Sequence, residues 1–590
     1  MIIHQAYFGD DNGSHNLLAT SIDSSQLIGK LKLTTDAPNS IQVSYPFLSG
    51  TFMEGHYIFT RTFPDMLAKR PGMVFSHCLI LPLESLSNLN NLKGLLRLFV
   101  SSSIKEKVIL GVAEIEETNS FVPKPPMFDT ILDCLLKNKQ TIVYPGYEGF
   151  EDVVCYLWPR LSTILRETFS FTISGRPSEV LDQSYTIVHT PHELEQRWTN
   201  FSIIRQRQDV EKSKAFMLIE NPELEDSFKL QQFIQEHAIL YKHLHQIPGI
   251  EKLYQLVSAA SQQSELVFLK RCFIGVNKWV PHSQTGKETK IRLLTFFLKK
   301  ILETDDSGFK LLRNMSFSAF EKGLEQVITV SQQWSSKYIN PNEDGQVSAQ
   351  VGLLKESFFG DAQNWWNEIV LDRFQTLFQS IDEESAKWIW KVWIEDSTLI
   401  DQTTKWLALE TERFLVKASP KDINAPVLQA LMTVCVDKKW LSLHAIIVAQ
   451  LFEPEQAISA QLKFDGSANL EEHISLMLPH ISDEAFVVAA TKIDDMRIYQ
   501  IAGKRCALKQ SLLQLLNVRI TSWQLIWYYA YQVSGQISQG ISDLQSELYK
   551  LFDLKIAKQY VHSELLQVLL TQVEDVSSYD KRKALSASLD

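Results

Sequence analysis

The sequence predicts an α+β N-terminal domain, a mixed sheet with flanking helices, followed by a long all-α region with helical-repeat character. Strand-like runs of aromatic and β-branched residues are concentrated in residues 1–205. Long amphipathic segments follow, and eleven of the thirteen tryptophans lie after residue 270. We therefore expect a helical middle region at 206–337, an all-helical C-terminal region at 351–573 and a frayed polar tail at 574–590.

The composition argues against several classes of protein. The net charge is -11, from 58 Lys and Arg against 69 Asp and Glu, so direct binding of nucleic acid is not expected. The six cysteines show no CxxC spacing, which argues against a zinc module or a disulfide framework and fits a reducing cytosol. The N-terminus lacks a signal-peptide pattern, and no run approaches the roughly 18 apolar residues of a membrane span. A cytoplasmic protein without membrane contact is expected.

The first residues predict a strand and then a helix. Ile2–Phe8 is rich in strand-forming residues and ends at the turn signal Gly9–Gly13. Gly13–Ala19 is expected to begin a helix, with Ser14 as its N-cap.

A β-hairpin is predicted at the densest mixture of strand and turn formers. Its strands are Tyr57–Phe63 and Met73–Leu81, with prolines and a glycine in the loop between them. Side chains alternate between the two faces of a strand, so Ser76 and His77 point apart. This adjacent Ser-His therefore cannot act as a nucleophile and its base.

The rest of the α/β part alternates helices and short strands. Apolar residues at helical spacing predict a helix over 150–165, which Pro159 should kink or divide. Strands are expected at Phe169–Ile173 and Tyr185–His189. Thr190–Glu193 is typical of a capping box that opens a further helix.

The second part of the chain predicts stacked helices. The breaks Arg205–Lys214 and Tyr338–Gln350 separate long amphipathic runs, and the tryptophans are expected to wedge between packed helices. Similar helix starts at 455 and 484 favour a repeat array. The principal predicted helices are Leu224–Tyr241, Ile250–Phe273, Thr289–Glu303, Phe317–Trp334, Trp365–Ile381, Ala386–Ile394, Gln402–Val416, Val427–Cys435, Trp440–Leu451, Pro454–Leu462, Leu470–Leu478, Asp483–Thr491, Leu508–Leu516 and Trp523–Val533.

No nucleotide-binding loop is complete. Gly50–Gly55 has the required glycine spacing, but His56 and Tyr57 replace the Lys and Ser/Thr that hold phosphate and Mg²⁺. Gly286-Lys287 has Pro281 in place of the first glycine. Nucleotide hydrolysis by this chain and a bound cofactor are therefore not expected.

Two polar constellations are candidate sites. His237, Tyr241 and His245 would share one helix face, where a solvated or core-edge position is favoured over a metal site because no acidic or cysteine partner has a supporting spacing.

The second constellation comprises His15, Arg61, Asp65, Arg70 and His77. Local hydrogen bonds could satisfy all five, with Asp65 and Arg70 closing their own loop. They could instead bind a ligand or partner, or a His and a carboxylate could do acid–base work. We assign no catalytic residue and no metal ligand.

Several short motifs occur in a fixed order over about the first 200 residues. They are His4–Gly9, Gly13–Ser21, Arg61–Asp65, Arg70–Gly72, Phe75–His77, Trp158–Leu161, Arg166, Phe169–Phe171, Thr190–Glu195 and Trp198. In this order they resemble the N-terminal domain of GTPase-associated protein 1, a family of bacterial conflict-system proteins encoded beside a GTPase. The helical remainder is similar only in kind. The resemblance implies a subunit that acts with a separate GTPase in defence against phage or other invasive DNA.

Three functional hypotheses follow. The leading one is a non-catalytic interaction or adaptor subunit, whose partners are a GTPase encoded nearby and further defence-system subunits or an effector. The second is an enzyme whose site uses His15, Arg61, Asp65 and His77, which requires these side chains to converge in one pocket. The third is a helical scaffold unrelated to defence.

Overall fold

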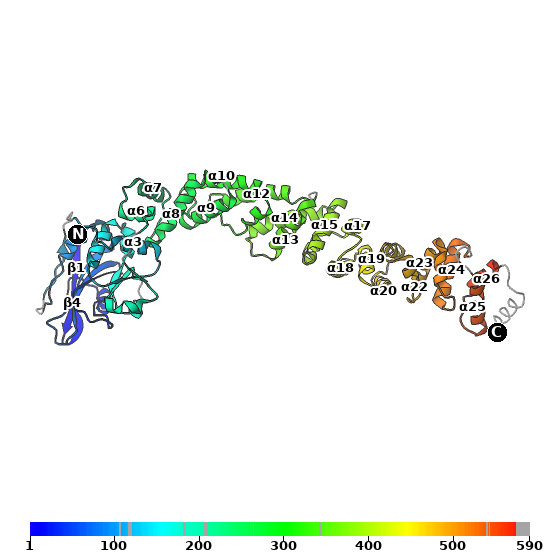
Figure 1. Cartoon of the computed structure of the whole chain (residues 1–590), viewed down its shortest axis with the longest axis horizontal. Helices are drawn as coiled ribbons and strands as arrows, with labels where there is room; N and C mark the ends of the chain where they lie inside the picture. Colours follow the sequence, from blue (N-terminus) through cyan, green and yellow to red (C-terminus); the bar gives the residue numbers. More distant parts are fainter. Residues whose placement is uncertain are drawn as a thin grey trace. The chain divides into compact units, whose positions relative to one another are not determined.

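The chain folds into two compact units. The computed structural model describes residues 1–104, 108–115, 121–180, 185–205, 210–263, 265–341, 344–537, 541 and 543–573. One unit comprises Met1–Lys300 with Met315–Gln326, and the other Ile301–Asn314 with Val327–Asp590. The predicted order, a mixed-sheet domain with helices and then a long all-helical region, is confirmed (Figure 1), and 58% of the chain is helical. The domain limits drawn from the sequence stay a prediction, and the expected tail at 574–590 lies outside the described residues.

A ten-stranded sheet forms the core of the first unit, in the order β10-β7-β9-β8-β3-β4-β5-β1-β2, with β6 paired to β1. The strands β3, β4, β5, β1 and β2 are antiparallel, whereas β10, β7, β9 and β8 are parallel. The two halves meet where Gly50 pairs with Phe171. The strands are β1 Ile2–Asp11, β2 Ser14–Thr20, β3 Phe47–Met53, β4 His56–Pro64, β5 Val74–Pro82, β6 Ala113–Glu114, β7 Ile142–Pro145, β8 Phe171–Ile173, β9 Ile187–Thr190 and β10 Ser202–Ile203.

The predicted helix after the first strand is wrong. Ser14–Thr20 is instead β2, which pairs antiparallel with β1. Asn12 and Gly13 both have positive φ, 56° and 85°, the backbone that a two-residue hairpin turn requires. The Asn-Gly pair therefore returns the chain as a strand, and Ser14 follows the turn rather than capping a helix.

The predicted central hairpin is confirmed as β4 and β5. Thr62 lies opposite Ser76, and their hydroxyl oxygens are 2.7 Å apart. Arg61 lies opposite His77 in the neighbouring pair, so Ser76 and His77 occupy opposite faces as expected.

The glycine pair that resembles a nucleotide loop belongs to the hairpin of β3 and β4. Glu54 and Gly55 form its turn with φ of 49° and 77°. A Cβ on Gly50 would lie 2.6 Å from Cε1 of Phe171 and 2.8 Å from the hydroxyl of Tyr57. The close packing of Phe171 and Tyr57 leaves no room for a side chain at position 50, which accounts for the glycine. The strand β4 follows Gly55, so there is no helix N-terminus at this point to bind a phosphate.

Helices cover both faces of the antiparallel half. Leu27 and Leu31 of α1 pack on the face of Ile58 and Cys78. On the other face, Trp158 packs at 5.2 Å between ring centroids from Phe59. The helical segments of this part of the chain are α1 Ser25–Thr34, η1 Leu83–Asn88, α2 Leu92–Leu96, α3 Phe128–Lys137, α4 Phe150–Leu157, η2 Trp158–Arg160, α5 Thr163–Thr168, η3 Pro177–Glu179, η4 His192–Trp198, α6 Lys214–Glu220, α7 Glu225–Glu236, η5 Leu244–Gln246, α8 Ile247–Ala259, α9 Leu266–Trp279 and α10 Lys287–Glu303.

Two helix predictions in this unit have different outcomes. Pro159 divides the predicted helix as expected, since α4 passes into the 3₁₀ turn η2 and then α5. The predicted capping box at Thr190–Glu193 is wrong. Thr190 ends β9, its hydroxyl accepts a hydrogen bond of 3.2 Å from the Trp198 indole, and Pro191 precedes the short 3₁₀ helix η4.

The second unit is a succession of helices in which each packs on the next one or two along the chain. Examples are α13 on α14 and α15, α19 on α20 and α21, and α23 on α24. This nearest-neighbour packing is typical of helical-repeat arrays. The helical segments are α11 Asp306–Lys310, α12 Gly323–Tyr338, η6 Asp344–Gln346, α13 Val347–Phe359, α14 Asn364–Gln379, α15 Glu383–Glu395, η7 Ser397–Leu399, α16 Ile400–Thr403, η8 Thr404–Trp406, η9 Leu409–Thr411, α17 Glu412–Lys417, α18 Ala425–Lys438, α19 Leu441–Leu451, α20 Pro454–Phe464, α21 Leu470–Met477, α22 Asp483–Ala490, α23 Met496–Leu508, η10 Gln510–Leu515, α24 Thr521–Ser534, α25 Leu544–Ile556 and α26 Ser563–Gln572.

Several helix limits differ from the predictions. The segment expected to be one helix over Ile250–Phe273 is two, α8 and α9, and Gln402–Val416 breaks into short pieces. The loop predicted to reach Gln350 is already helical from Val347, and α23 was not predicted. Packing against neighbouring helices helps to set such limits, which local sequence signals alone do not fix to the residue.

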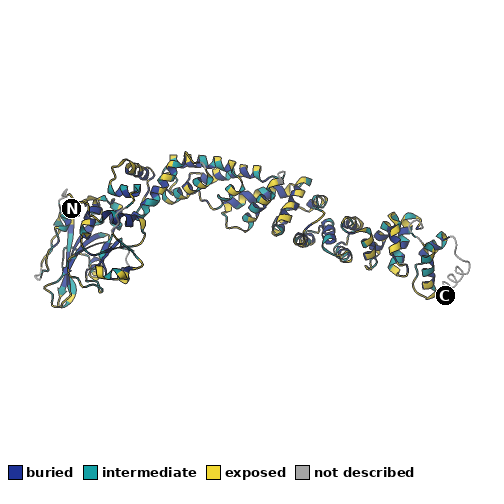
Figure 2. Cartoon of the chain, viewed as in Figure 1, coloured by how far each residue is buried: buried dark blue, intermediate teal, exposed yellow. Residues whose placement is uncertain are grey.

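The predicted role of the tryptophans is confirmed by α15. Its Trp388, Trp390 and Trp393 are buried, and their indole N–H groups donate to Gln350 on α13, the Leu415 carbonyl on α17 and the hydroxyl of Thr403 on α16. The buried residues follow the contact faces between successive helices (Figure 2). Among the described residues, no helix combines the length and the apolar character needed to cross a bilayer.

Candidate functional site

The five side chains singled out by the sequence do not converge in one pocket. Arg61 and His77 are cross-strand neighbours on one face of the sheet. His15 pairs with Asp10 and stacks on Phe8, which pairs with Ser76 on the other face. A single site that used His15 together with Arg61 and His77 would have to reach through the sheet.

His77 is a fully buried and fully hydrogen-bonded histidine. The Val100 backbone N–H donates to Nδ1 at 3.2 Å, so the other ring nitrogen, Nε2, carries the proton and donates to Oε1 of Gln5 at 3.1 Å. The rings of Tyr7 and Phe99 enclose it. Burial, and then the nearby charge of Arg61, lower the pKa of His77 to about 4. This histidine is neutral at pH 7 and ties β1, β5 and residue 100 together.

His15 belongs to the opposite face. Its Nε2 is 3.2 Å from the hydroxyl of Thr35, and its Nδ1 lies 4.0 Å from the carboxylate of Asp36. Burial lowers its pKa, although Asp36 acts in the other direction. The hydroxyl of Ser76 donates to the Thr35 carbonyl at 2.6 Å, so both residues hold the end of α1 on the sheet.

Asp65 and Arg70 organise the loop of the central hairpin. The Asp65 carboxylate accepts a hydrogen bond of 3.0 Å from the Leu67 backbone N–H. Arg70 extends to the neighbouring turn, where its guanidinium donates to the carbonyl of Gly13 at 3.1 Å. The loop between β4 and β5 is thereby joined to the turn between β1 and β2. A role for these residues in binding stays a prediction.

Arg61 reaches a small hollow that the sequence did not indicate. Its guanidinium donates to Glu151 at 2.6 Å and lies 5.1 Å from the ring centroid of Phe99. Glu151 and Asp152 line a cavity of about 220 Å³ together with His189. Neither ring nitrogen of buried His189 has a hydrogen-bond partner among the described residues, and burial lowers its pKa to about 3.

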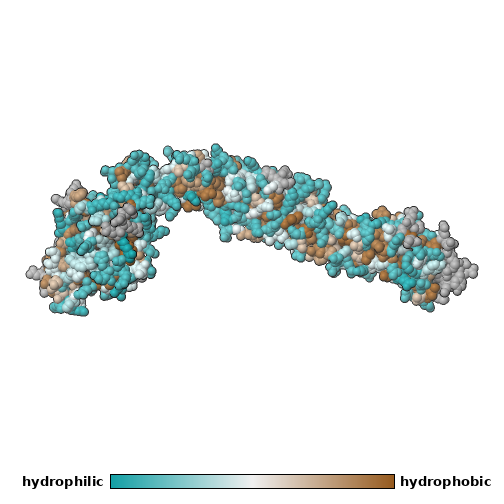
Figure 3. Space-filling model, viewed as in Figure 1, coloured by the Kyte–Doolittle hydropathy of each residue, from teal (hydrophilic) through white to brown (hydrophobic). Residues whose placement is uncertain are grey.

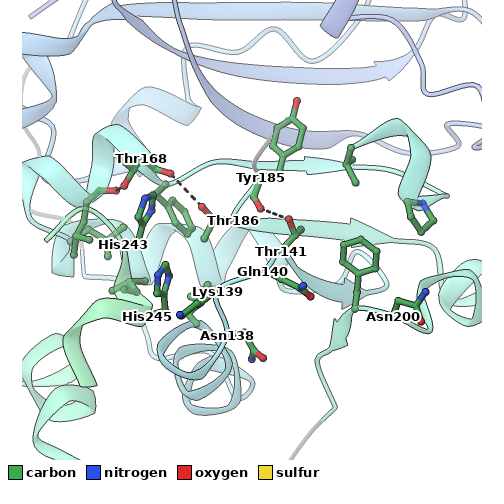
Figure 4. A pocket seen from close by; sticks show the side chains of 18 of the residues that line it. Asn138, Lys139, Gln140, Thr141, Thr168, Tyr185, Thr186, Asn200, His243 and His245 are labelled. Atoms are coloured by element: carbon green, nitrogen blue, oxygen red, sulfur yellow. Dashed lines mark hydrogen bonds between the residues drawn. The ribbon is translucent and has the colours of Figure 1, made fainter. Parts of the chain in front are cut away.

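A larger cavity, of about 690 Å³, lies where the parallel strands begin. Thr141, Phe169, Thr186 and Phe201 stand immediately or two residues before β7, β8, β9 and β10, and all four line it. A segment around η5 closes one side, held by the hydrogen bond from the Thr168 hydroxyl to the Lys242 carbonyl. Figure 4 shows this cavity with its polar side chains.

The described side chains of this cavity that can carry a positive charge have no acidic counterpart among its described lining residues. Among the described residues that line it are Lys139, Arg197, His243 and His245, and none is an aspartate or glutamate. Lys139, His243 and His245 lie together at one end, away from Asn200 (Figure 4). Burial, and then the charges of His243 and Lys139, lower the pKa of His245. The geometry suits a ligand that brings negative charge to this end.

The helix face predicted for His237, Tyr241 and His245 is wrong, although His245 does line the cavity. The helix α7 ends at Glu236, and Ala238 has a φ of 47°, so His237 and His245 do not share a helix face. His237 instead contacts the Phe233 carbonyl through Nδ1, at 2.9 Å. Among the described residues, no group of three or more His, Cys, Asp or Glu side chains is arranged to hold a metal ion. The His-x-His spacing of His243 and His245 after Lys242 was the available signal for the cavity, but its other residues come from distant parts of the chain.

Comparison with known proteins places a family match on the antiparallel half of the sheet. The family model described as GTPase-associated protein 1, N-terminal domain type 1, matches residues 2–99. The match spans β1 to β5, η1 and α2, including the central hairpin, and ends before α3. The motifs between Trp158 and Trp198 lie outside it. No curated protein and no solved structure matches the chain significantly.

Proposed function

We propose that this chain is a non-catalytic interaction subunit that works with a separate GTPase. The observation that carries the proposal is the match of residues 2–99 to the N-terminal domain of a GTPase-associated protein. In this arrangement the partner hydrolyses GTP, and this chain recognises the partner and presents further binding surface. The incomplete nucleotide-loop signatures in the sequence agree with a division of labour between two molecules.

The helical unit supports an adaptor role because it exposes large apolar side chains on successive helices. Several lie between α23 and α25, where a partner that covered them would bury apolar surface. They are Met496, Leu508, Leu515, Ile520, Val533 and Ile556. Hydrophobic residues also stand among hydrophilic ones on the face shown in Figure 3. A surface of this kind is suited to binding a protein.

We further propose that the pair acts in a bacterial conflict system, against phage or other invasive DNA. The motif series that continues from residue 158 to residue 198 supports this role through its resemblance to the same family. The GTPase would be encoded nearby, and further defence-system subunits or an effector would be additional partners.

Co-purification tests the proposal. The full chain is mixed with the product of a neighbouring GTPase gene, loaded with GDP or with a non-hydrolysable GTP analogue, and analysed by gel filtration with light scattering. A stable complex in at least one nucleotide state is expected. A chain that elutes unchanged in both states would remove the proposal.

A pair of variants locates the contact. Leu508, which is 79% exposed, is replaced by Asp, and Leu409, which is 62% exposed and lies outside the α23–α25 group, is replaced by Asp as the matched control. The adaptor model in which the α23–α25 surface binds the GTPase predicts loss of the complex for Leu508→Asp alone. An intact complex with both variants would assign the contact to the N-terminal unit.

A further inference from the structure

We propose that the cavity at the amino ends of β7 to β10 binds the phosphate group of a small organic phosphate of about nucleotide size. This inference goes beyond the proposed function and does not depend on a GTPase. A cavity of about 690 Å³ is within the range that small-molecule ligands occupy. All its described lining residues belong to the first unit.

The cationic end of the cavity supplies the charge that a phosphate requires. The rings of His243 and His245 are stacked, with centroids 5.4 Å apart and an angle of 8° between their planes. Lys139 lies beside them (Figure 4), and its charge acts on His245. Burial, and then the charges of His243 and Lys139, lower the pKa of His245, and a bound anion would act in the other direction and favour a ring that donates from both nitrogens.

The neighbouring hydroxyl groups are already used within the protein. The Thr141 hydroxyl donates to the Tyr185 carbonyl at 2.6 Å, and the Thr186 hydroxyl to the Thr168 carbonyl at 3.4 Å. The Asn138 side chain bonds to the Cys134 carbonyl and to Ser202. The donors that remain for a ligand at this end are therefore the nitrogens of Lys139 and of the two histidines.

The backbone around His243 is held by Gln246. The Gln246 N–H donates to the His243 carbonyl at 3.1 Å, and the Gln246 side chain accepts hydrogen bonds from the backbone N–H groups of His243 at 3.1 Å and Lys242 at 2.8 Å. These bonds hold the segment that carries both histidines in place before a ligand arrives.

The rest of the cavity would hold the organic part of the ligand. Its walls include apolar and aromatic side chains, with the amide groups of Gln140 and Asn200 among them. Such walls bind a flat or apolar group and orient it through a few hydrogen bonds. Inorganic phosphate alone would leave most of the cavity empty. The apolar side chains concerned are Leu161, Leu165, Phe169, Val180 and Phe201.

Phosphorus-31 NMR on the full chain tests the inference with three probes: inorganic phosphate, adenosine 5′-monophosphate and, observed by proton NMR, uncharged adenosine. We expect the chain to broaden the resonances of both phosphates, with the monophosphate binding more tightly than phosphate. Adenosine should bind more weakly than its monophosphate because it lacks the charged group.

The variants Lys139→Gln and His245→Gln are each expected to weaken binding of the monophosphate about tenfold, as the loss of one charge-assisted hydrogen bond implies. The matched control is Lys252→Gln, the same change at an exposed position of α8 outside the cavity, which should bind as the unaltered chain does. Failure of both phosphates to bind would overturn the inference. So would equal affinity in the unaltered chain, Lys139→Gln and His245→Gln. Neither result would bear on the GTPase complex.

Discussion

The guanidinium of Arg61 on β4 donates a 2.6 Å hydrogen bond to the carboxylate of Glu151 in the first turn of α4. This pair connects the antiparallel half of the sheet to the helix that follows the parallel strand β7. The two side chains are 22% and 39% exposed, so solvent screens part of their attraction. Arg61 also packs over Phe99, which adds an apolar contact to the charged one.

A double-mutant cycle should separate these two contributions. We expect Arg61→Met, which keeps much of the packing, and Glu151→Gln to show a coupling of about 0.5 kcal/mol in the free energy of unfolding. Arg61→Ala should cost about 1 kcal/mol more than Arg61→Met, since it also removes the contact with Phe99. Urea unfolding measures each variant. A coupling near zero would mean that the Arg61–Glu151 ion pair is formed but contributes nothing to the free energy of unfolding.

His77→Gln should make the first unit less sensitive to acid. The folded-state pKa of His77 is lowered to about 4 from the ordinary 6.5, so the unfolded chain binds a proton first as the pH falls. Stability that is complete above pH 6.5 is therefore lost progressively down to pH 4, by about 3 kcal/mol in all. Glutamine can accept from Val100 and donate to Gln5 without titrating.

The measurement is the free energy of unfolding between pH 7.5 and pH 4.5, followed in urea. His77→Gln is expected to be less stable at pH 7.5, because the ring between Tyr7 and Phe99 is lost, and to decline less steeply with acid. His56→Gln, at a partly exposed position in the same hairpin, serves as the control and should retain the original slope. An unchanged acid slope in His77→Gln would contradict the assignment of a buried neutral histidine.

Local sequence signals were sufficient to predict those elements that depend on residues close together in the chain. The central hairpin, the division at Pro159 and the wedging of tryptophans between helices follow from alternation, ring chemistry and bulk, and the structure confirms them. The error at Ser14 has the same origin. The turn signal that ends at Gly13 is correct, but Asn12-Gly13 sends the chain back as the strand β2, where the sequence predicts a helix capped by Ser14.

The cavity could not have been derived in this way. Its lining comes from the residues before four strands, from the helical segments α3, α5 and η3 and from a segment near 244, which only the complete fold brings together. His245 stood out in the sequence, but nothing local connects it with Lys139 or Arg197. The same limit applies to Arg61, whose partner Glu151 lies 90 positions away.

Asp465→Asn should strongly destabilise the helical unit. The Asp465 carboxylate is buried and accepts hydrogen bonds from Ser467 and His473, while Gln461 bridges it to His444. Burial would raise the pKa of Asp465, but the hydrogen bonds from Ser467 and His473 outweigh it and lower the pKa overall. An asparagine would place its NH₂ group against these donors, and we expect this to lower the free energy of unfolding by about 3 kcal/mol.

Because the folded-state pKa of Asp465 is lowered, its contribution to stability is present above the ordinary value of 3.8 and is lost as the pH falls through the lowered one. The urea transition of the helical unit, followed by tryptophan fluorescence, measures the effect at pH 7. Asp437→Asn is the matched control at an exposed position of α18 and should change the free energy by no more than about 0.5 kcal/mol. Equal effects of the two variants would refute a buried carboxylate network.

Gly503→Ala should destabilise the helical unit, although alanine has the higher helix propensity. At an exposed helix position this change is expected to stabilise by about 0.5–1 kcal/mol. At Gly503 of α23, however, a Cβ would lie 2.5 Å from Cβ of Tyr529, 3.0 Å from the backbone nitrogen of Ala530 and 3.1 Å from the carbonyl oxygen of Ile526. Since two of these atoms belong to the backbone of α24, the helices would have to move apart, and we expect a net loss of about 2 kcal/mol.

Gly352→Ala provides the control for this prediction within the same unit. Gly352 is also inside a helix, α13, and the nearest atom to its added Cβ would be Nζ of Lys310 at 3.1 Å, the free end of a flexible side chain. That ammonium group can shift at little cost, so the gain in helix propensity should remain and the variant should be neutral or slightly more stable. Opposite signs of the two changes in urea unfolding would establish backbone contact between α23 and α24. If Gly503→Ala were also stabilising, these two helices could not pack at the separation that the structure shows.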